Sequence, residues 1–115
     1  MQKKSFDNPD ETRTPEKTKV EVVKIGDNNV MRATFEPGWR WSDNVKPVAG
    51  TDSCQVHHMG VHLSGKLHVK LDDGTEDEFG PGDVANVPPG HDAWVVGDES
   101  VVMIDFAGGE AYAKK

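Results

Sequence analysis

Residues 80–90 read GPGDVANVPPG, a strand of about five residues between two groups of glycine and proline. Both residues mark turns, because glycine reaches backbone angles closed to other residues and proline lacks the N–H that a β-ladder needs. Short apolar runs alternate with turn residues elsewhere too: VEVVKI (20–25), VMRATF (30–35), KLHVKL (66–71), AWVV (93–96) and VVMIDF (101–106). The pattern predicts about eight to ten short strands, no helix and an antiparallel sandwich or barrel.

The composition fits one small domain and restricts its partners. A chain of 115 residues can build a single hydrophobic core, and its formal net charge is −7. That charge disfavours nucleic acids and anionic membrane surfaces, which reward clustered lysine and arginine, so a small neutral or cationic ligand fits better. One cysteine, no signal-peptide pattern and no apolar run of membrane length predict a soluble, cytoplasmic protein without disulfides.

The N-terminal segment differs from the rest. Residues 1–17 carry Phe6 as their only large apolar side chain besides the initiator methionine, with two prolines and alternating charge. Such a segment buries too little apolar surface to offset the entropy of ordering it. We therefore expect a disordered tail over residues 1–17, a β-barrel over 18–110 and a short C-terminal tail over 111–115.

The stretch that follows Pro81 resembles the second sequence motif of the cupin superfamily, small β-barrels that hold a metal or small ligand in their mouth. The family pattern is glycine, five residues, proline, one residue, glycine, two residues and histidine. Gly82, Pro88 and Gly90 match, whereas Ala93 stands at the histidine position and His91 comes two residues earlier. Residues two apart in a strand share a face, so His91 remains a candidate ligand. The resemblance implies an all-β fold, the antiparallel double-stranded β-helix or jelly-roll barrel.

The first cupin motif, His-any-His, three or four residues, Glu, six residues and Gly, is matched less closely. Anchored on Gly65, the motif puts His58 at the glutamate, Cys54 at the second histidine and Asp52 at the first. We prefer this anchor because residues 63–67 read as a turn between two strands. The resemblance therefore implies a site whose ligand set is atypical for the family.

An alternative anchor on Gly50 puts His58 at the second histidine and His62 at the glutamate, so His58 is a candidate in both registers. In a strand over residues 53–65, SCQVHHMGVHLSG, alternate side chains share a face, which separates His57 from the candidates. Singly, such residues are more often core or hydrogen-bonded side chains, but a metal site needs three or four converging donors. The candidate metal ligands are Cys54, His58, His62 and His91.

Three tryptophans are candidates for the wall of a ligand pocket. Trp39 and Trp41 share one face by period two, and Trp94 follows His91 closely. Tryptophan usually buries its ring wherever the indole N–H finds a partner, so core filling is the competing interpretation. The pocket interpretation makes Trp39, Trp41 and Trp94 the substrate-binding residues, gathered near the barrel mouth.

Two functions follow. The first is a small metal-dependent enzyme of cupin type, with an undetermined reaction, in which the barrel mouth holds a small molecule and a divalent transition metal. A histidine and cysteine donor set without glutamate favours zinc, copper or nickel, with iron as a further candidate. The second is a binding or sensor domain without metal, which Ala93 favours; no Ser-His-Asp or Cys-His nucleophile is legible. Residues 20–25 predict a pairing strand, and hence a homodimer.

Overall fold

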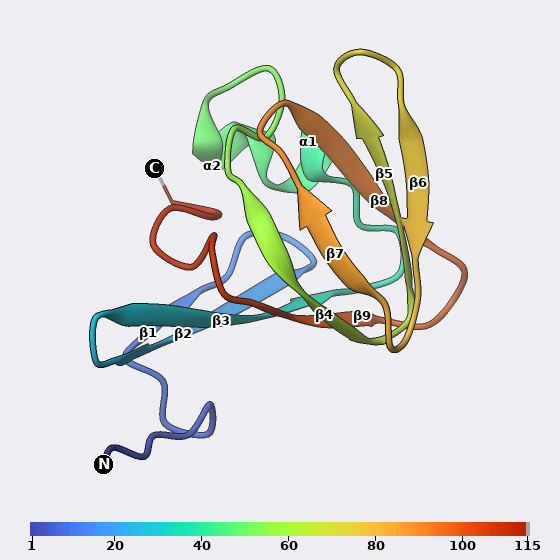
Figure 1. Cartoon of the computed structure of the whole chain (residues 1–115). Helices are drawn as coiled ribbons and strands as arrows, with labels where there is room; N and C mark the ends of the chain where they lie inside the picture. The colour runs from blue at the N-terminus through green and yellow to red at the C-terminus, as the bar shows by residue number, and fades with distance from the viewer. Residues whose placement is uncertain (115) are drawn as a thin grey trace.

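The computed structural model describes residues 1–114, and within them it contains nine strands and two short helices (Figure 1). In chain order these elements are β1 (Glu11–Arg13), β2 (Thr18–Ile25), β3 (Asn28–Phe35), α1 (Trp41–Asn44), α2 (Lys46–Ala49), β4 (His58–Ser64), β5 (Lys66–Leu71), β6 (Glu76–Phe79), β7 (Val84–Val87), β8 (His91–Val96) and β9 (Val101–Asp105).

Antiparallel pairing joins the strands into two sheets. The larger has the order β1-β2-β3-β9-β4-β7, and the smaller has the order β6-β5-β8. Alternate residues point into the core, as in β9, where Val101, Met103 and Asp105 are buried and the residues between them are partly exposed. The antiparallel all-β fold predicted from the sequence is confirmed.

Two glycines bring the strands close enough to form the site. A Cβ on Gly60 would lie 1.8 Å from the carbonyl oxygen of Ile104, so only glycine permits the close approach of β4 and β9. Gly90, in the turn before β8, has φ of 90°, which favours glycine, and its N–H donates to the carbonyl oxygen of Cys54 at 2.7 Å. These contacts fix β4 against β9, and residue 54 against the start of β8.

The structure places Glu11–Arg13, within the expected disordered tail, in strand β1. Within residues 1–17, β1 pairs with β2, and the guanidinium of Arg13 donates to the carbonyl oxygens of Glu110 and Tyr112. Tyr112 is itself buried, which differs from the expected C-terminal tail over 111–115, of which Lys115 lies outside the described residues. Backbone pairing and hydrogen bonds hold this polar segment. The expectation of disorder rested mainly on its small number of apolar side chains.

The two helices were not expected, and each spans only four residues, too few to leave a helical period in the sequence. The side-chain oxygen of Asn44 accepts from the N–H of Arg40 where α1 begins, and α2 ends at Gly50, which has φ of 76°. Figure 1 shows both helices at one end of the barrel. Among the described residues, no helix has the length and apolarity that crossing a membrane requires.

Candidate metal centre

Three of the four candidate ligands come together at one end of the barrel. The donor atoms of Cys54, His58 and His91 all lie within 4.8 Å of one another, and we refer to these residues as the Cys54–His58–His91 cluster. His58 begins β4 and His91 begins β8. Cys54 lies in the loop before β4, and its N–H donates to the carbonyl oxygen of His91 at 2.7 Å. Backbone pairing therefore sets the distance between the thiol and the two imidazoles.

Asp105 orients the ring of His58. The Nδ1–H of His58 donates to Oδ2 of Asp105, which is 0% exposed, while Oδ1 accepts from the N–H groups of Ala107 and Gly108, each at 2.8 Å. Burial raises the pKa of Asp105, but the hydrogen bonds from His58, Gly108 and Ala107 outweigh it and hold the pKa below its ordinary value. The ionised carboxylate fixes the proton of His58 on Nδ1, which leaves the Nε2 lone pair for the cluster.

A backbone carbonyl orients His91 in the same way. Nδ1 of His91 lies 2.8 Å from the carbonyl oxygen of Pro88, which can only accept, so Nδ1 carries the proton and Nε2 keeps its lone pair. Burial and the neighbouring His58 lower the pKa of His91 to about 4, so the ring is neutral at pH 7. Metal-binding histidines commonly have such an acceptor on the second ring nitrogen.

Cys54 completes the cluster as a protonated thiol. Its Sγ lies 3.7 Å from Nε2 of His58, and the side chain is 2% exposed. Burial raises the pKa of the Cys54 thiol to about 11. A coordinated cation reverses this preference, because it stabilises the thiolate directly.

Cys54, His58 and Asp105 also have the order of nucleophile, base and orienting acid found in cysteine hydrolases. Two observations oppose that chemistry. Reactive cysteines have a lowered pKa and partial exposure, whereas the thiol here is buried and its pKa is raised. The N–H of Cys54, which could have stabilised an oxyanion, already donates to His91. The arrangement therefore suits a ligand better than a nucleophile.

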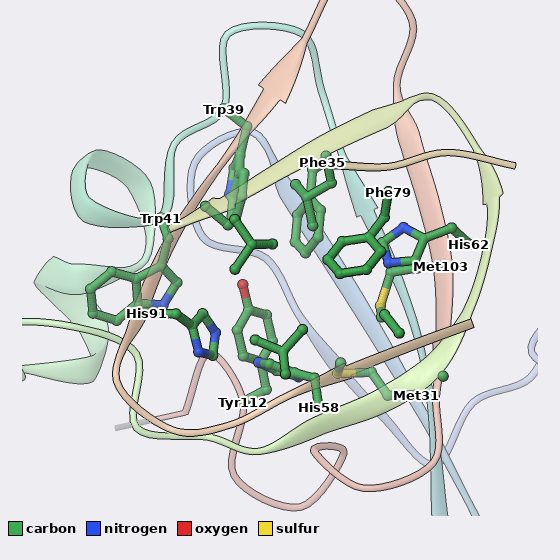
Figure 2. Close-up of a pocket in the computed structure, with 16 residues that line it drawn as sticks. Met31, Phe35, Trp39, Trp41, His58, His62, Phe79, His91, Met103 and Tyr112 are labelled. Carbon is green, nitrogen blue, oxygen red and sulfur yellow. The ribbon is translucent and has the colours of Figure 1, made fainter. Parts of the chain in front are cut away.

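Two residues of the cluster, His58 and His91, line a small, mostly apolar cavity of about 40 Å³ (Figure 2). Trp39 and Trp41 both line it, and each is 2% exposed, so the core and pocket interpretations of these residues coincide. The ring of Trp39 stacks on Phe35 with centroids 4.0 Å apart, and its Nε1–H donates to Oγ1 of Thr18. The stacked rings of Phe35 and Trp39 thus form one wall of the cavity.

Trp94 does not join them, which corrects its predicted place in the pocket. Its ring stacks on His68 at 4.7 Å, and the guanidinium of Arg40 lies 4.2 Å from the ring centroid. Because β8 alternates, His91 and Ala93 point inward and Trp94 points away from the cavity.

His62 is the candidate ligand that the structure keeps apart from the cluster. It follows His58 by four residues on the same face of β4, which is about 13 Å along a strand. Its ring stacks on Phe79, with centroids 5.4 Å apart and an interplanar angle of 14°. In Figure 2 it stands at the opposite side of the cavity from Trp41 and His91. Unlike His58 and His91, it has no acceptor on Nδ1.

Two residues of the site, Asp105 and Tyr112, were not predicted from the sequence. Asp105 left a signal, because it takes the third inward position of VVMIDF, where an acid is unusual among buried apolar residues. Tyr112 left none. Its ring lies 4.9 Å from that of His58 at 79°, and it lines the cavity, but the segment after β9 has no strand or helix period.

Comparisons with known proteins agree with this fold. No protein-family model matches the sequence, and no curated protein matches it significantly. Among solved structures, a protein of unknown function from Rhizobium leguminosarum is 19% identical, with a TM-score of 0.62, over 93% of this chain and 97% of that chain. A cupin-like protein from Thermotoga maritima is 19% identical, with a TM-score of 0.55, over 80% of this chain and 68% of that chain.

A third similar structure is oxalate decarboxylase from Bacillus subtilis, described together with its Mn(II) centres. It is 24% identical with a TM-score of 0.56, over 89% of this chain but only 28% of that chain. Similarity at this level of identity shows the fold alone. The chain has the cupin fold.

Proposed function

We propose that this protein binds a divalent transition metal through Cys54, His58 and His91, and that the ion holds a small molecule in the adjacent cavity. The observation that carries the proposal is the orientation of the two histidines. Each has an acceptor on Nδ1, Asp105 for His58 and Pro88 for His91, and each is left with an Nε2 lone pair for the cluster.

The spacing of the cluster fits an ion. Bond lengths of about 2.0–2.1 Å to nitrogen and 2.3 Å to sulfur place tetrahedral donors about 3.3–3.6 Å apart. The Cys54 Sγ to His58 Nε2 distance of 3.7 Å is close to this range, and all three donors already lie within 4.8 Å. Three protein ligands leave one position for a small molecule, as in catalytic rather than structural zinc sites.

The donor types favour particular metals. Imidazole suits zinc, copper, iron and nickel, and a thiolate favours the softer ions of that group. The cluster has no carboxylate ligand of the kind that suits manganese, since Asp105 is engaged with His58 and backbone N–H groups. Zinc, copper and nickel are therefore the better candidates, with iron after them.

The surrounding residues define what such a centre could do. An ion at this position would act as a Lewis acid that polarises a carbonyl or hydroxyl oxygen of the small molecule. The cavity walls are mostly apolar, and burial raises the pKa of Tyr112 well above its ordinary value, so its hydroxyl, which points into the cavity in Figure 2, keeps its proton. Tyr112 could thus donate a hydrogen bond to a bound oxygen.

Titration of chelator-stripped, tag-free protein with Co(II) tests the proposal. We expect one equivalent to bind with a sulfur-to-cobalt charge-transfer band. His58→Ala and His91→Ala should each weaken binding at least about tenfold. His57→Ala is the matched control, because His57 is exposed and its ring contacts Asn86. Equal uptake by all four proteins would contradict the proposal, and no uptake by any of them would favour a binding domain without metal.

A homodimer is the second part of the proposal, on a different surface from the one expected. β2 lies between β1 and β3, so residues 20–25 are not an edge. Instead, the outer face of β4 and β7, together with the residue that follows β9, exposes large apolar side chains: Met59, Leu63, Val84 and Phe106. Such patches are typical of protein interfaces. Sedimentation equilibrium should give a dimer that Val84→Lys weakens, whereas a wild-type monomer at high concentration would contradict the idea.

A further inference from the structure

His62 has an unusual environment for a histidine. The side chain is 2% exposed, and its Nδ1 is the one buried side-chain nitrogen or oxygen in residues 1–114 that has no hydrogen-bond partner. Buried polar groups are nearly always paired, because the loss of water is otherwise uncompensated. An unpaired group of this kind therefore calls for a partner outside the chain itself.

The position of His62 relates this need to the cavity. The ring lines the cavity from β4, with apolar neighbours around it, among them Phe79 and Met103 (Figure 2). His58 and His91 of the cluster line the same cavity away from His62 (Figure 2). A molecule in this space would thus meet polar groups at two separated points, with mostly apolar side chains and the Tyr112 hydroxyl between them (Figure 2).

We propose that His62 hydrogen-bonds the distal polar group of the small molecule whose other end binds the metal. The inference rests on the proposed metal centre and specifies its ligand class. The ligand has an oxygen-bearing head that binds the ion, a short apolar body, and one uncharged hydrogen-bonding group, such as a hydroxyl, at the far end. The cavity is small, about 40 Å³, so the apolar body is short.

The chemistry of His62 explains why the distal group is uncharged. Burial lowers the pKa of His62, so the ring is neutral and offers one donor and one acceptor. Two carboxylates, Asp83 and Asp105, oppose this effect, and His58 reinforces it. A neutral imidazole pairs well with a hydroxyl, whereas a buried carboxylate at this end would find no cation there.

Two series of probes test the inference on zinc-loaded protein. The first is the straight-chain alkanoates from propanoate to hexanoate, whose carboxylate can bind the ion, and the second is their ω-hydroxy counterparts. We expect at least one hydroxy acid to bind about tenfold more tightly than its parent, because the hydroxyl reaches His62. His62→Phe should abolish this preference and leave the parent alkanoates nearly unchanged. If the phenyl ring of His62→Phe is too large for the site, His62→Leu replaces it as the test variant.

His68→Phe is the matched control, because His68 also stacks on an aromatic ring but lies away from the cavity. It should keep the preference. No preference in wild type at any chain length, or the same preference in His62→Phe, would overturn the inference.

A metal-independent measurement separates this inference from the proposed function. Propanol, butanol and pentanol have no metal-binding head, so they can be added to metal-free protein while the ring nitrogens of His62 are followed by NMR. A shift of these signals supports the role of His62 even if no metal binds, which would contradict the metal centre alone. Unmoved signals, together with no preference for hydroxy acids on the zinc-loaded protein, contradict the role of His62 alone.

Discussion

Asp105→Asn is the substitution that most sharply tests how the cluster is prepared for a metal. Asparagine has nearly the same shape, and its side-chain oxygen can keep both hydrogen bonds from Ala107 and Gly108. Its NH₂ group then takes the place of the oxygen that accepts from Nδ1 of His58. Because an NH₂ group can only donate, Nδ1 must become the acceptor, and the proton of the ring moves to Nε2.

The magnitude follows from the tautomer. Nε2 is the atom that lies 3.7 Å from Cys54 Sγ, so protonating it removes the lone pair that the metal needs. To bind a metal, the His58 ring must either return its proton to Nδ1, where it would face the NH₂ group of the introduced asparagine donor to donor, or turn away from that group. Loss of such an orienting group typically weakens metal affinity about 10 to 100-fold, which is about 1.4–2.8 kcal/mol.

Competition with a chromophoric chelator for zinc measures the effect directly. Glu76→Gln is the matched control, because Glu76 pairs with Nε2 of His68 at 2.8 Å on the outside of the barrel. It should leave zinc affinity unchanged. The reasoning is refuted if a folded Asp105→Asn protein binds zinc within about twofold of wild type.

Three further predictions concern the walls of the site, the strand packing and the pH dependence. Tyr112 and Cys54 are both buried and line the same hollow, so Tyr112→Ala should cost about 3 kcal/mol of stability and speed the reaction of Cys54 with a thiol reagent. Tyr112→Phe keeps the ring in place and serves as control, and an unchanged rate in Tyr112→Ala would mean that the ring does not protect the thiol. Gly60→Ala should lower the free energy of unfolding by more than about 3 kcal/mol, because its Cβ would collide with the Ile104 carbonyl. Gly80→Ala is the control, since the nearest atom to its Cβ would be 3.9 Å away. Equal stability of the two variants would disprove the close approach of β4 and β9. In the metal-free protein, His91 has a pKa of about 4, against about 6.5 when unfolded, so the unfolded chain takes up more protons between these values. Its contribution to stability is nearly complete at pH 7 and falls by about 2 kcal/mol by pH 5. His91→Gln should remove this dependence, and an identical slope in the variant would assign it to other groups.

The fold was predictable because local patterns specify it. The turn residues of GPGDVANVPPG bound β7, and alternating apolar residues mark most other strands. The cluster was partly predictable, since Cys54, His58 and His91 were found by motif spacing. Strand alternation outward from His91 also places Trp94 on the outer face, so that error came from proximity in sequence rather than from missing information.

The remaining parts of the site depend on contacts between distant segments. Asp105 reaches His58 across 47 residues through the pairing of β4 with β9. Tyr112 reaches the cavity because Arg13, near the other end of the chain, holds its backbone carbonyl. Neither contact leaves a periodic signal in a single sequence. His62 is likewise separated from the cluster because it lies four residues beyond His58 along β4. The two motif registers did not decide whether His62 is a ligand.

X-ray absorption at the zinc edge of the reconstituted protein tests the proposed metal centre, because it reports the donor atoms themselves. We expect one sulfur at about 2.3 Å and two imidazole nitrogens at about 2.0–2.1 Å, with a fourth light atom from solvent or ligand. Cys54→Ser should remove the sulfur contribution and leave the imidazole scattering. A first shell without sulfur in the wild-type protein would contradict the assignment of Cys54, His58 and His91 as the metal centre.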